Sequence, residues 1–300
     1  MTLCIAAICD GNDESNGSKI VLCSDLEKET EGVGASETED KLGMVRSGWP
    51  VLCAGVISSS NALVNVYAGY LEKNFDKITE FTLMDHLRVP AHVQKAKLVD
   101  HYLQQSFSFN RAYFYGQGKS KLPEEFVARQ QDAISRIKLE ASLIICGFMD
   151  ERDYVTNTVN KLPFICVVDD TRSSNGVEEV MLEYEYDAIG SGSATALSML
   201  YRREQDSTDS LASTLYNVYE ANGMSDKVPG VGKSFINLAV LYRDGHLEAV
   251  TEDGYKYLKK QFTRFGPKRT KEDSFTVNSG FLEPYDFQTN QPPTPSQQVT

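Results

Sequence analysis

Apolar residues in the first quarter of the chain form four short runs, followed by one longer run with helical spacing. The runs TLCIAAIC (2–9) and KIVLCSD (19–25) flank a polar, glycine-containing loop, which predicts a β-hairpin with a long tip. LGMVRS (42–47) and PVLCAG (50–55) predict a second hairpin. Residues 58–75 open with serines and then place apolar residues at helical spacing. The pattern therefore predicts four strands and then a helix.

The remaining pattern predicts alternating groups of helices and strands. A helical insert spans about 76–139, with helical segments at 91–109 and 122–139. Three strands, two helices and a hairpin follow, over 141–149, 162–170, 180–190, 193–204, 207–222 and 235–253. The tail 266–300 is polar and rich in Pro, Ser, Thr and Gln, which predicts disorder, with docking of FLEPYDF (281–287) as the alternative.

Strands joined as hairpins favour antiparallel sheets, and grouped helices favour layers on their outer faces. The runs VLCAGV and LIICGF are apolar on both faces, as in strands covered on both sides. The sequence therefore predicts an α+β protein with a single domain over 1–265. A four-layer α/β/β/α sandwich of two antiparallel sheets fits the pattern, and the pattern alone leaves other α+β folds open.

Composition and charge narrow the classes of partner. The chain is 41% hydrophobic and 24% charged, with a net charge of −12. An acidic surface repels phosphate groups, so neither nucleic acid nor an anionic membrane is expected as a partner. No apolar run is long enough for a membrane span, and the start MTLCIAAICDG is not that of a secretory signal. A cytoplasmic location is expected.

The cysteines indicate buried, reduced thiols. Most of the six lie in apolar runs, and they form no CxxC pair and accompany no histidine cluster. A zinc site is therefore not expected. Neither a metal nor an organic cofactor is predicted.

Four positions in the predicted strands could carry nucleophilic chemistry: Thr2, Asp25, Lys41 and Gly55. The hydroxyl of an N-terminal threonine can pass its proton to the free α-amine of the same residue. A lysine cation stabilises the developing alkoxide, a carboxylate holds the lysine, and a glycine N–H receives the oxyanion. Each residue also has a purely structural interpretation. Thr2 is a common second residue, and Asp25 could be a turn residue at the end of a strand. Lys41 could be a solvated charge on a loop, and Gly55 could relieve strain at a strand end.

In their order and spacing these residues resemble the N-terminal part of proteasome β subunits and their bacterial relatives, the N-terminal nucleophile (Ntn) hydrolases. Asp25 and Lys41 are sixteen residues apart, and Lys41 and Gly55 fourteen, as in that family. DAIGSGSATAL (187–197) is similar to the family's strand–GSG–helix element, in which Ser191 takes the place of the serine near the nucleophile. Ser191 could also be a helix N-cap.

A later segment extends the resemblance and also departs from it. SDKVPGVGKSFINLAVL resembles the family's Asp-x-x-Ser-Gly-Gly stretch, with Asp226 at the aspartate and Pro229 where the family has serine. PGVGKS (229–234) is not a phosphate-binding loop, because Lys227 stands where the first glycine is required and a strand-like run follows. The helical insert and the tail look more like an uncharacterised bacterial branch near the group called Anbu, whose members also begin Met-Thr.

The resemblance implies the Ntn-hydrolase fold and cleavage of a peptide or other amide bond through an acyl-enzyme on Thr2, once Met1 is removed. It also implies substrate pockets near residues 26–29 and 56–59, a homo-oligomer, and an activator that the sequence does not identify. Two alternatives stay open. One is a catalytically inactive, structural or scaffolding subunit, and the other is a non-proteolytic amidase or ligase that uses the same acyl-enzyme.

Overall fold

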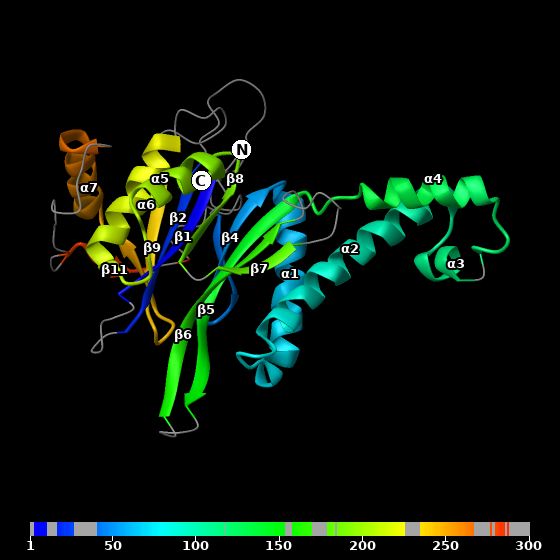
Figure 1. Ribbon diagram of the computed structural model, residues 1–300, viewed down its shortest axis with the longest axis horizontal. Helices are drawn as coiled ribbons and strands as arrows, with labels where there is room; N and C mark the ends of the chain where they lie inside the picture. Colours follow the sequence, from blue (N-terminus) through cyan, green and yellow to red (C-terminus); the bar gives the residue numbers. More distant parts are fainter. Residues whose placement is uncertain are drawn as a thin grey trace, which may run out of the picture.

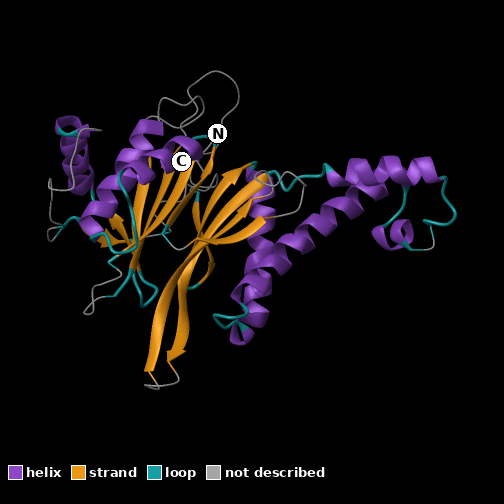
Figure 2. Cartoon of the chain, viewed as in Figure 1, coloured by secondary structure: helices purple, strands orange, loops and turns teal. Residues whose placement is uncertain are grey.

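A computed structural model shows two antiparallel sheets with helices on their outer faces (Figures 1 and 2). It describes residues 3–10, 17–26, 41–116, 118–153, 158–169, 179–183, 185–225, 235–266, 277, 280–285 and 287. Within these residues one sheet has six strands in the order β11-β10-β9-β2-β1-β8, and the other has five in the order β3-β4-β5-β6-β7. The predicted α+β class with two antiparallel sheets is confirmed.

Each sheet takes strands from distant parts of the chain. The six-stranded sheet contains β1 (Leu3–Cys9), β2 (Lys19–Leu26), β8 (Tyr186–Gly190), β9 (Phe235–Leu241), β10 (Leu247–Val250) and β11 (Leu282–Pro284). The five-stranded sheet contains β3 (Leu42–Arg46), β4 (Trp49–Gly55), β5 (Ala141–Asp153), β6 (Thr158–Asp169) and β7 (Glu179–Glu183). β5 and β6 extend beyond their neighbours as a two-stranded ribbon (Figure 1).

Side-chain alternation along the strands explains why the core strands are apolar on both faces. In β1, Leu3 and Ile5 pack toward helices on the outer face, whereas Cys4 and Ala6 pack into the cluster between the sheets. Ile144 in β5 belongs to the same inter-sheet cluster. All five side chains are fully buried, so both sheets are covered on both faces along their central strands.

Helices form the two outer layers. On the six-stranded sheet these are α5 (Ser193–Arg202), α6 (Leu211–Ser225) and α7 (Glu252–Arg264). On the five-stranded sheet these are α1 (Ile57–Asn74), the short 3-10 helix η1 (Phe75–Lys77) and the start of α2 (Leu83–Phe107). Among the described residues, no helix has the length and hydrophobicity that crossing a membrane would require.

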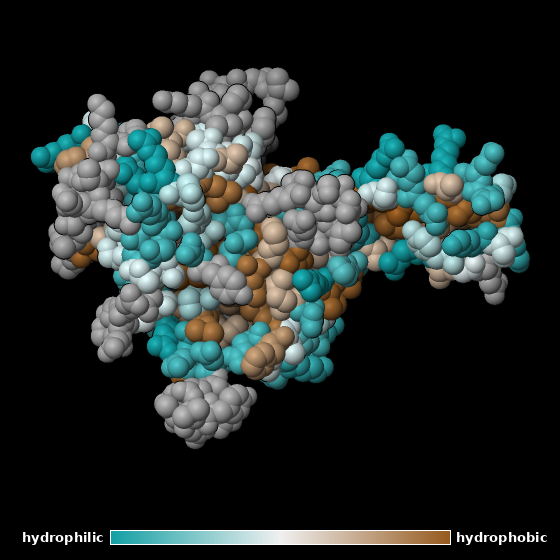
Figure 3. All heavy atoms as spheres, in the orientation of Figure 1, coloured by the Kyte–Doolittle hydropathy of each residue, from teal (hydrophilic) through white to brown (hydrophobic). Residues whose placement is uncertain are grey.

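The far half of α2 leaves the sheets and forms an arm with α3 (Arg111–Tyr115) and α4 (Glu124–Ser135) (Figure 1). At about 1.5 Å per residue, the 25 residues of α2 span about 37 Å. The arm has its own small apolar cluster, whose buried members are Val99, Leu103, Phe114, Val127 and Ile134. Figure 3 shows a mainly hydrophilic arm surface with a hydrophobic seam between its helices.

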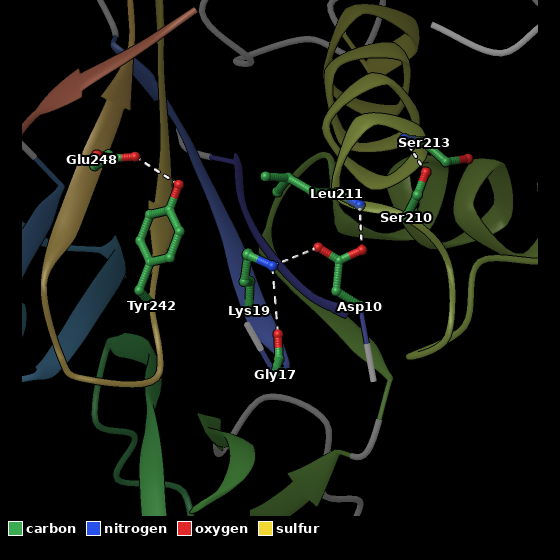
Figure 4. A network of polar contacts seen from close by, with 8 residues as sticks. All are labelled: Asp10, Gly17, Lys19, Ser210, Leu211, Ser213, Tyr242 and Glu248. Atoms are coloured by element: carbon green, nitrogen blue, oxygen red, sulfur yellow. Dashed lines mark hydrogen bonds and ion pairs between the residues drawn. The ribbon is translucent and has the colours of Figure 1, made fainter. Parts of the chain in front are cut away.

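A polar contact network fixes the end of the first hairpin against α6 (Figure 4). Lys19 Nζ lies 2.7 Å from Asp10 Oδ2, and the side chains of both residues are largely buried. The other carboxylate oxygen of Asp10 accepts a hydrogen bond of 2.9 Å from Leu211 N, the first residue of α6. Asp10 therefore satisfies a free N–H group at the helix N-terminus from a distant part of the sequence.

The structure corrects two predicted elements. The single strand predicted over 180–190 is two strands, because β7 pairs with β6 in one sheet and β8 pairs with β1 in the other. The helix predicted to begin at residue 91 begins at Leu83 and continues through the buried Pro90. Pro90 is inside the helix, where a proline removes one backbone hydrogen bond, and the helix nevertheless continues past it to Phe107.

The tail also differs from the prediction of disorder over 266–300. Leu282–Pro284 forms β11 and pairs with β10, and Phe281 is buried under α7. Tyr285 accepts at its hydroxyl oxygen from Asn237 Nδ2 and packs with Phe287 against the inter-sheet cluster. For the described residues of 281–287, the structure agrees with the alternative prediction, in which this segment docks onto the rest of the protein.

Candidate active site

The start of β1 lies between two strand ends in the six-stranded sheet. Leu3 is opposite Gly190 at the end of β8, and Cys4 is opposite Ser24 on β2. Asp25 follows Ser24 directly, so its carboxylate is positioned beside the first described residue of β1. This juxtaposition follows from the β1–β2 hairpin that the alternating pattern predicts.

The carboxylate of Asp25 joins the backbone of β1 to a lysine. Asp25 is fully buried, and its Oδ1 accepts hydrogen bonds from Leu3 N at 2.9 Å and from Lys41 Nζ at 2.7 Å. The Lys41 side chain is 16% exposed. A buried carboxylate requires a compensating cation, and Lys41 supplies that charge while its ammonium stays near the start of β1.

Lys41 is also fixed to the second sheet. Its carbonyl oxygen accepts from Cys53 N at 2.9 Å, and the Cys53 carbonyl oxygen accepts from Cys4 Sγ at 3.3 Å. Because Cys53 precedes Gly55 by two residues, the lysine, the start of β1 and the end of β4 are held in one place. The structure therefore brings together three of the predicted site residues, Asp25, Lys41 and Gly55.

Gly55 has a backbone conformation and surroundings that exclude a side chain. Its φ is +108°, and a Cβ atom there would lie 2.5 Å from Glu140 O and 2.9 Å from Ala141 Cα. The Glu140 carbonyl oxygen accepts from Val56 N at 2.9 Å, which holds the chain in this turn. Gly55 is exposed, and so are the next side chains, Val56 (50%) and Ile57 (48%).

Ser191 lies at the same end of the six-stranded sheet. It follows Gly190, the residue opposite Leu3, and it is exposed. α5 begins at Ser193 with Gly192 as its N-cap residue and without a side-chain cap hydrogen bond. The helix-capping interpretation of Ser191 is therefore wrong. Ser191 nevertheless follows the residue that pairs with Leu3 at the start of β1.

Several predicted positions lie outside the described residues: Thr2, Asp226, Pro229 and the segment 27–29. The strand that follows the PGVGKS segment is described, and it is β9. A phosphate-binding loop requires a helix at this point, so the rejection of that motif agrees with the structure.

The cysteine nearest the site has the properties of a neutral, buried thiol. Burial raises the pKa of Cys4 well above its usual value, and the charge of Asp25 raises it further. Its thiolate is therefore strongly disfavoured, and Cys4 acts as a hydrogen-bond donor. All six cysteines are free in the structure, and five are buried, as predicted from the apolar runs that contain them.

Sequence reasoning did not identify Glu140 and Cys53 as parts of this site. Both contribute through backbone atoms, which leave no residue-type signal. Glu140 is 85 positions after Gly55 in the sequence, and the helical arm lies between them. Its positive φ of 58° marks the sharp turn from the arm into β5.

A metal site or a histidine-based catalytic site finds less support among the described residues. No group of three or more His, Cys, Asp or Glu side chains there could hold a metal ion. His86 bonds through Nδ1 to the Tyr70 hydroxyl in the helix layer, and His246 contacts Asp244 at the β9–β10 turn. No protein-family model matches the chain, and a comparison with curated proteins finds no significant match.

Proposed function

We propose that the chain is an N-terminal threonine hydrolase with the Ntn-hydrolase fold, which cleaves peptide or other amide bonds through an acyl-enzyme on Thr2 after Met1 is removed. The observation that carries the proposal is the shared acceptor Asp25 Oδ1, bonded to both Leu3 N and Lys41 Nζ. Leu3 follows Thr2 in the sequence, so these two contacts support a lysine charge near the proposed nucleophile.

The proposed reaction uses each residue in a separate role. Thr2 Oγ attacks the carbonyl carbon while its proton passes to the Thr2 α-amine, and the positive charge of Lys41 stabilises the oxygen as it becomes nucleophilic. Asp25 holds the lysine. The N–H of Gly55 donates to the oxyanion, which a side chain at that position would obstruct.

The second half of the reaction restores the nucleophile. The C–N bond breaks and the protonated amine of Thr2 gives its proton to the departing nitrogen, which leaves an ester on Oγ. Water then attacks the ester with the same amine as base, releases the acid and regenerates the hydroxyl. Ser191 and Asp226 are proposed to orient the amine.

The exposed side chains after Gly55 suggest how the substrate would lie. Val56 and Ile57 form an apolar surface beside the proposed oxyanion position, so an apolar group next to the scissile carbonyl would be accommodated. The arm projects away from the sheets rather than across this end of them (Figure 2), so it does not restrict the substrate to small amides.

The proposal is tested by turnover of a panel of fluorogenic peptide amides, with protein whose first residue is Thr2. We expect Thr2→Ala to abolish turnover and Lys41→Met to lower kcat by about 10²–10³, the size of a lost electrostatic contribution to the transition state. The control is Lys73→Met at the exposed end of α1, which should keep full activity.

A folded Lys41→Met protein with full activity would refute the mechanism. An inactive wild type whose Thr2 is also unreactive would support the scaffolding alternative.

A further inference from the structure

A cavity of about 380 Å³ lies at the opposite end of the two sheets from Asp25 and Lys41. It is bordered by the turns that precede β4 and β10 and by the start of the β5–β6 ribbon. Trp49 at its edge begins β4 and Gly55 ends that strand, so at about 3.3 Å per residue the two regions are about 20 Å apart. The cavity is therefore separate from the proposed active site.

The cavity exists because two turns from different sheets meet. Gly48 has a φ of +75° and Gly245 a φ of +90°, and a Cβ built on Gly48 would lie 3.3 Å from Gly245 Cα. Side chains at these positions would push the turns apart. The two glycines thus let the backbones close one side of the cavity without filling it.

The apolar part of the cavity is aromatic. Its lining includes Trp49, Phe75 and Phe148, and the Trp49 ring packs edge-on against Phe75 with centroids 5.3 Å apart. Trp49 and Phe148 are almost fully buried, with exposures of 3% and 7%, so only a small part of each ring is accessible from the cavity. These rings provide a rigid surface for the flat or apolar part of a ligand.

Two arginines from different sheets line the same cavity, Arg46 and Arg243. Arg46 lies over the ring of Phe75, and burial lowers the pKa of its guanidinium. In the described part of the chain, neither arginine has a carboxylate within 4.0 Å. The negative charge of Asp76 acts on Arg46 in the opposite direction and raises its pKa.

The other charged groups at the cavity already have partners. Lys161 Nζ is 3.1 Å from Asp150 Oδ1. The carboxylate of Asp244 accepts from the backbone N of His246 at 3.1 Å and contacts the ring of the same residue. With Lys161 and Asp150 paired, two arginines face the single carboxylate of Asp244, so the cavity lining carries one excess positive charge.

We propose that this cavity binds a small organic anion, a carboxylate or phosphate ester with an aromatic or other flat apolar group. The anion would accept hydrogen bonds from Arg46 and Arg243, which suit planar two-oxygen acceptors, and the apolar group would lie against Trp49. The size of the cavity is within the usual range for small-molecule sites.

The single tryptophan of the chain provides a direct test, because it lines the cavity. Phenyl phosphate is titrated into the full-length protein while Trp49 fluorescence is recorded, with inorganic phosphate and benzyl alcohol as probes that carry only the charge or only the ring. We expect a saturable change with phenyl phosphate, and binding at least about tenfold weaker for either partial probe.

Substituted proteins distinguish binding by the two cavity arginines from a general effect of removing one positive charge. Arg243→Met and Arg46→Met should each weaken phenyl phosphate binding by about tenfold, since each removes a charged hydrogen-bond donor. Arg202→Met, at an exposed position on α5, should leave binding unchanged. Circular dichroism confirms that each variant is folded. No saturable change at millimolar phenyl phosphate, equal binding of inorganic phosphate, or full binding by the folded Arg46→Met/Arg243→Met double variant would overturn the proposal.

Discussion

At the residue scale, the molecule concentrates its unusual features where β1, β2 and β4 meet. Asp25 is fully buried and lies 2.7 Å from Lys41 Nζ, and Gly55 has a conformation that other residues rarely adopt. Buried ion pairs seldom add stability over a well-packed apolar pair. Their presence here is better explained by a role for the lysine charge at the start of β1.

The Asp25–Lys41 pair makes a stability prediction that does not depend on catalysis. Lys41→Met leaves a buried carboxylate without its cation and should lower the free energy of unfolding by about 3–5 kcal/mol. Asp25→Asn combined with Lys41→Met should cost less than the sum of the two single changes. Urea unfolding measures all three variants, and additive losses would contradict the direct pairing.

Gly55 offers a second test, with another glycine as its control. Gly55→Ala places a Cβ 2.5 Å from Glu140 O at a φ of +108° and should destabilise the fold by about 2 kcal/mol or more. Gly69 lies inside α1, and a methyl group there would meet no neighbouring side chain or strand within 4 Å, so Gly69→Ala should stabilise by up to about 1 kcal/mol. Thermal unfolding compares the two, and equal effects would contradict the close approach at Gly55.

At the element scale, the arm has its own core and should unfold separately from the sheets. Phe114 is 1% exposed in the arm cluster, so Phe114→Ala should expose the amides of the far half of α2, of α3 and of α4 to exchange. The sheets should keep their protection. Hydrogen exchange read by mass spectrometry measures this, with Tyr115→Ala at a 48% exposed side chain as the control. Loss of protection in β1 and β5 as well would show that the arm and the sheets unfold together.

The strand β11 makes a prediction about the tail. Phe281 is 7% exposed and packs against the outer cluster of the six-stranded sheet, so Phe281→Ala should cost about 3–5 kcal/mol of stability. Glu283 is exposed in the same strand, and Glu283→Ala should stay within about 0.5 kcal/mol. Chemical denaturation distinguishes the two. An equally small effect of Phe281→Ala would show that the tail does not dock in solution.

The sequence pattern predicted the hairpins well because local alternation and turn residues determine them. It did not predict where the chain changes sheets, because the apolar pattern of 180–190 continues from β7 into β8. It also missed α7, although Thr251 accepts from Gly254 N as an N-cap and two acidic residues follow it. β11 could not be predicted, since a three-residue strand depends on its partner.

At the scale of the whole molecule, both proposed sites lie at ends of the two sheets. The ends of β2 and β4 carry Asp25 and Gly55, and the turns before β4 and β10 border the arginine-lined cavity. The sequence predicts the two hairpins that carry Asp25, Lys41 and Gly55, and the packing of the two sheets then brings these residues together. The cavity depends on a contact between two distant turns, which no local pattern indicates.

The central claim is that the hydroxyl of Thr2 is made nucleophilic by Lys41. The most direct measurement is the intact mass of Met1-free protein after treatment with a panel of small β-lactones, followed by peptide mapping. We predict a single adduct on Thr2 in the wild type, none in Thr2→Ala, and strongly slowed labelling in Lys41→Met. If folded wild-type protein that begins at Thr2 acquires no adduct there, or if Lys41→Met is labelled as fast as the wild type, the account is contradicted.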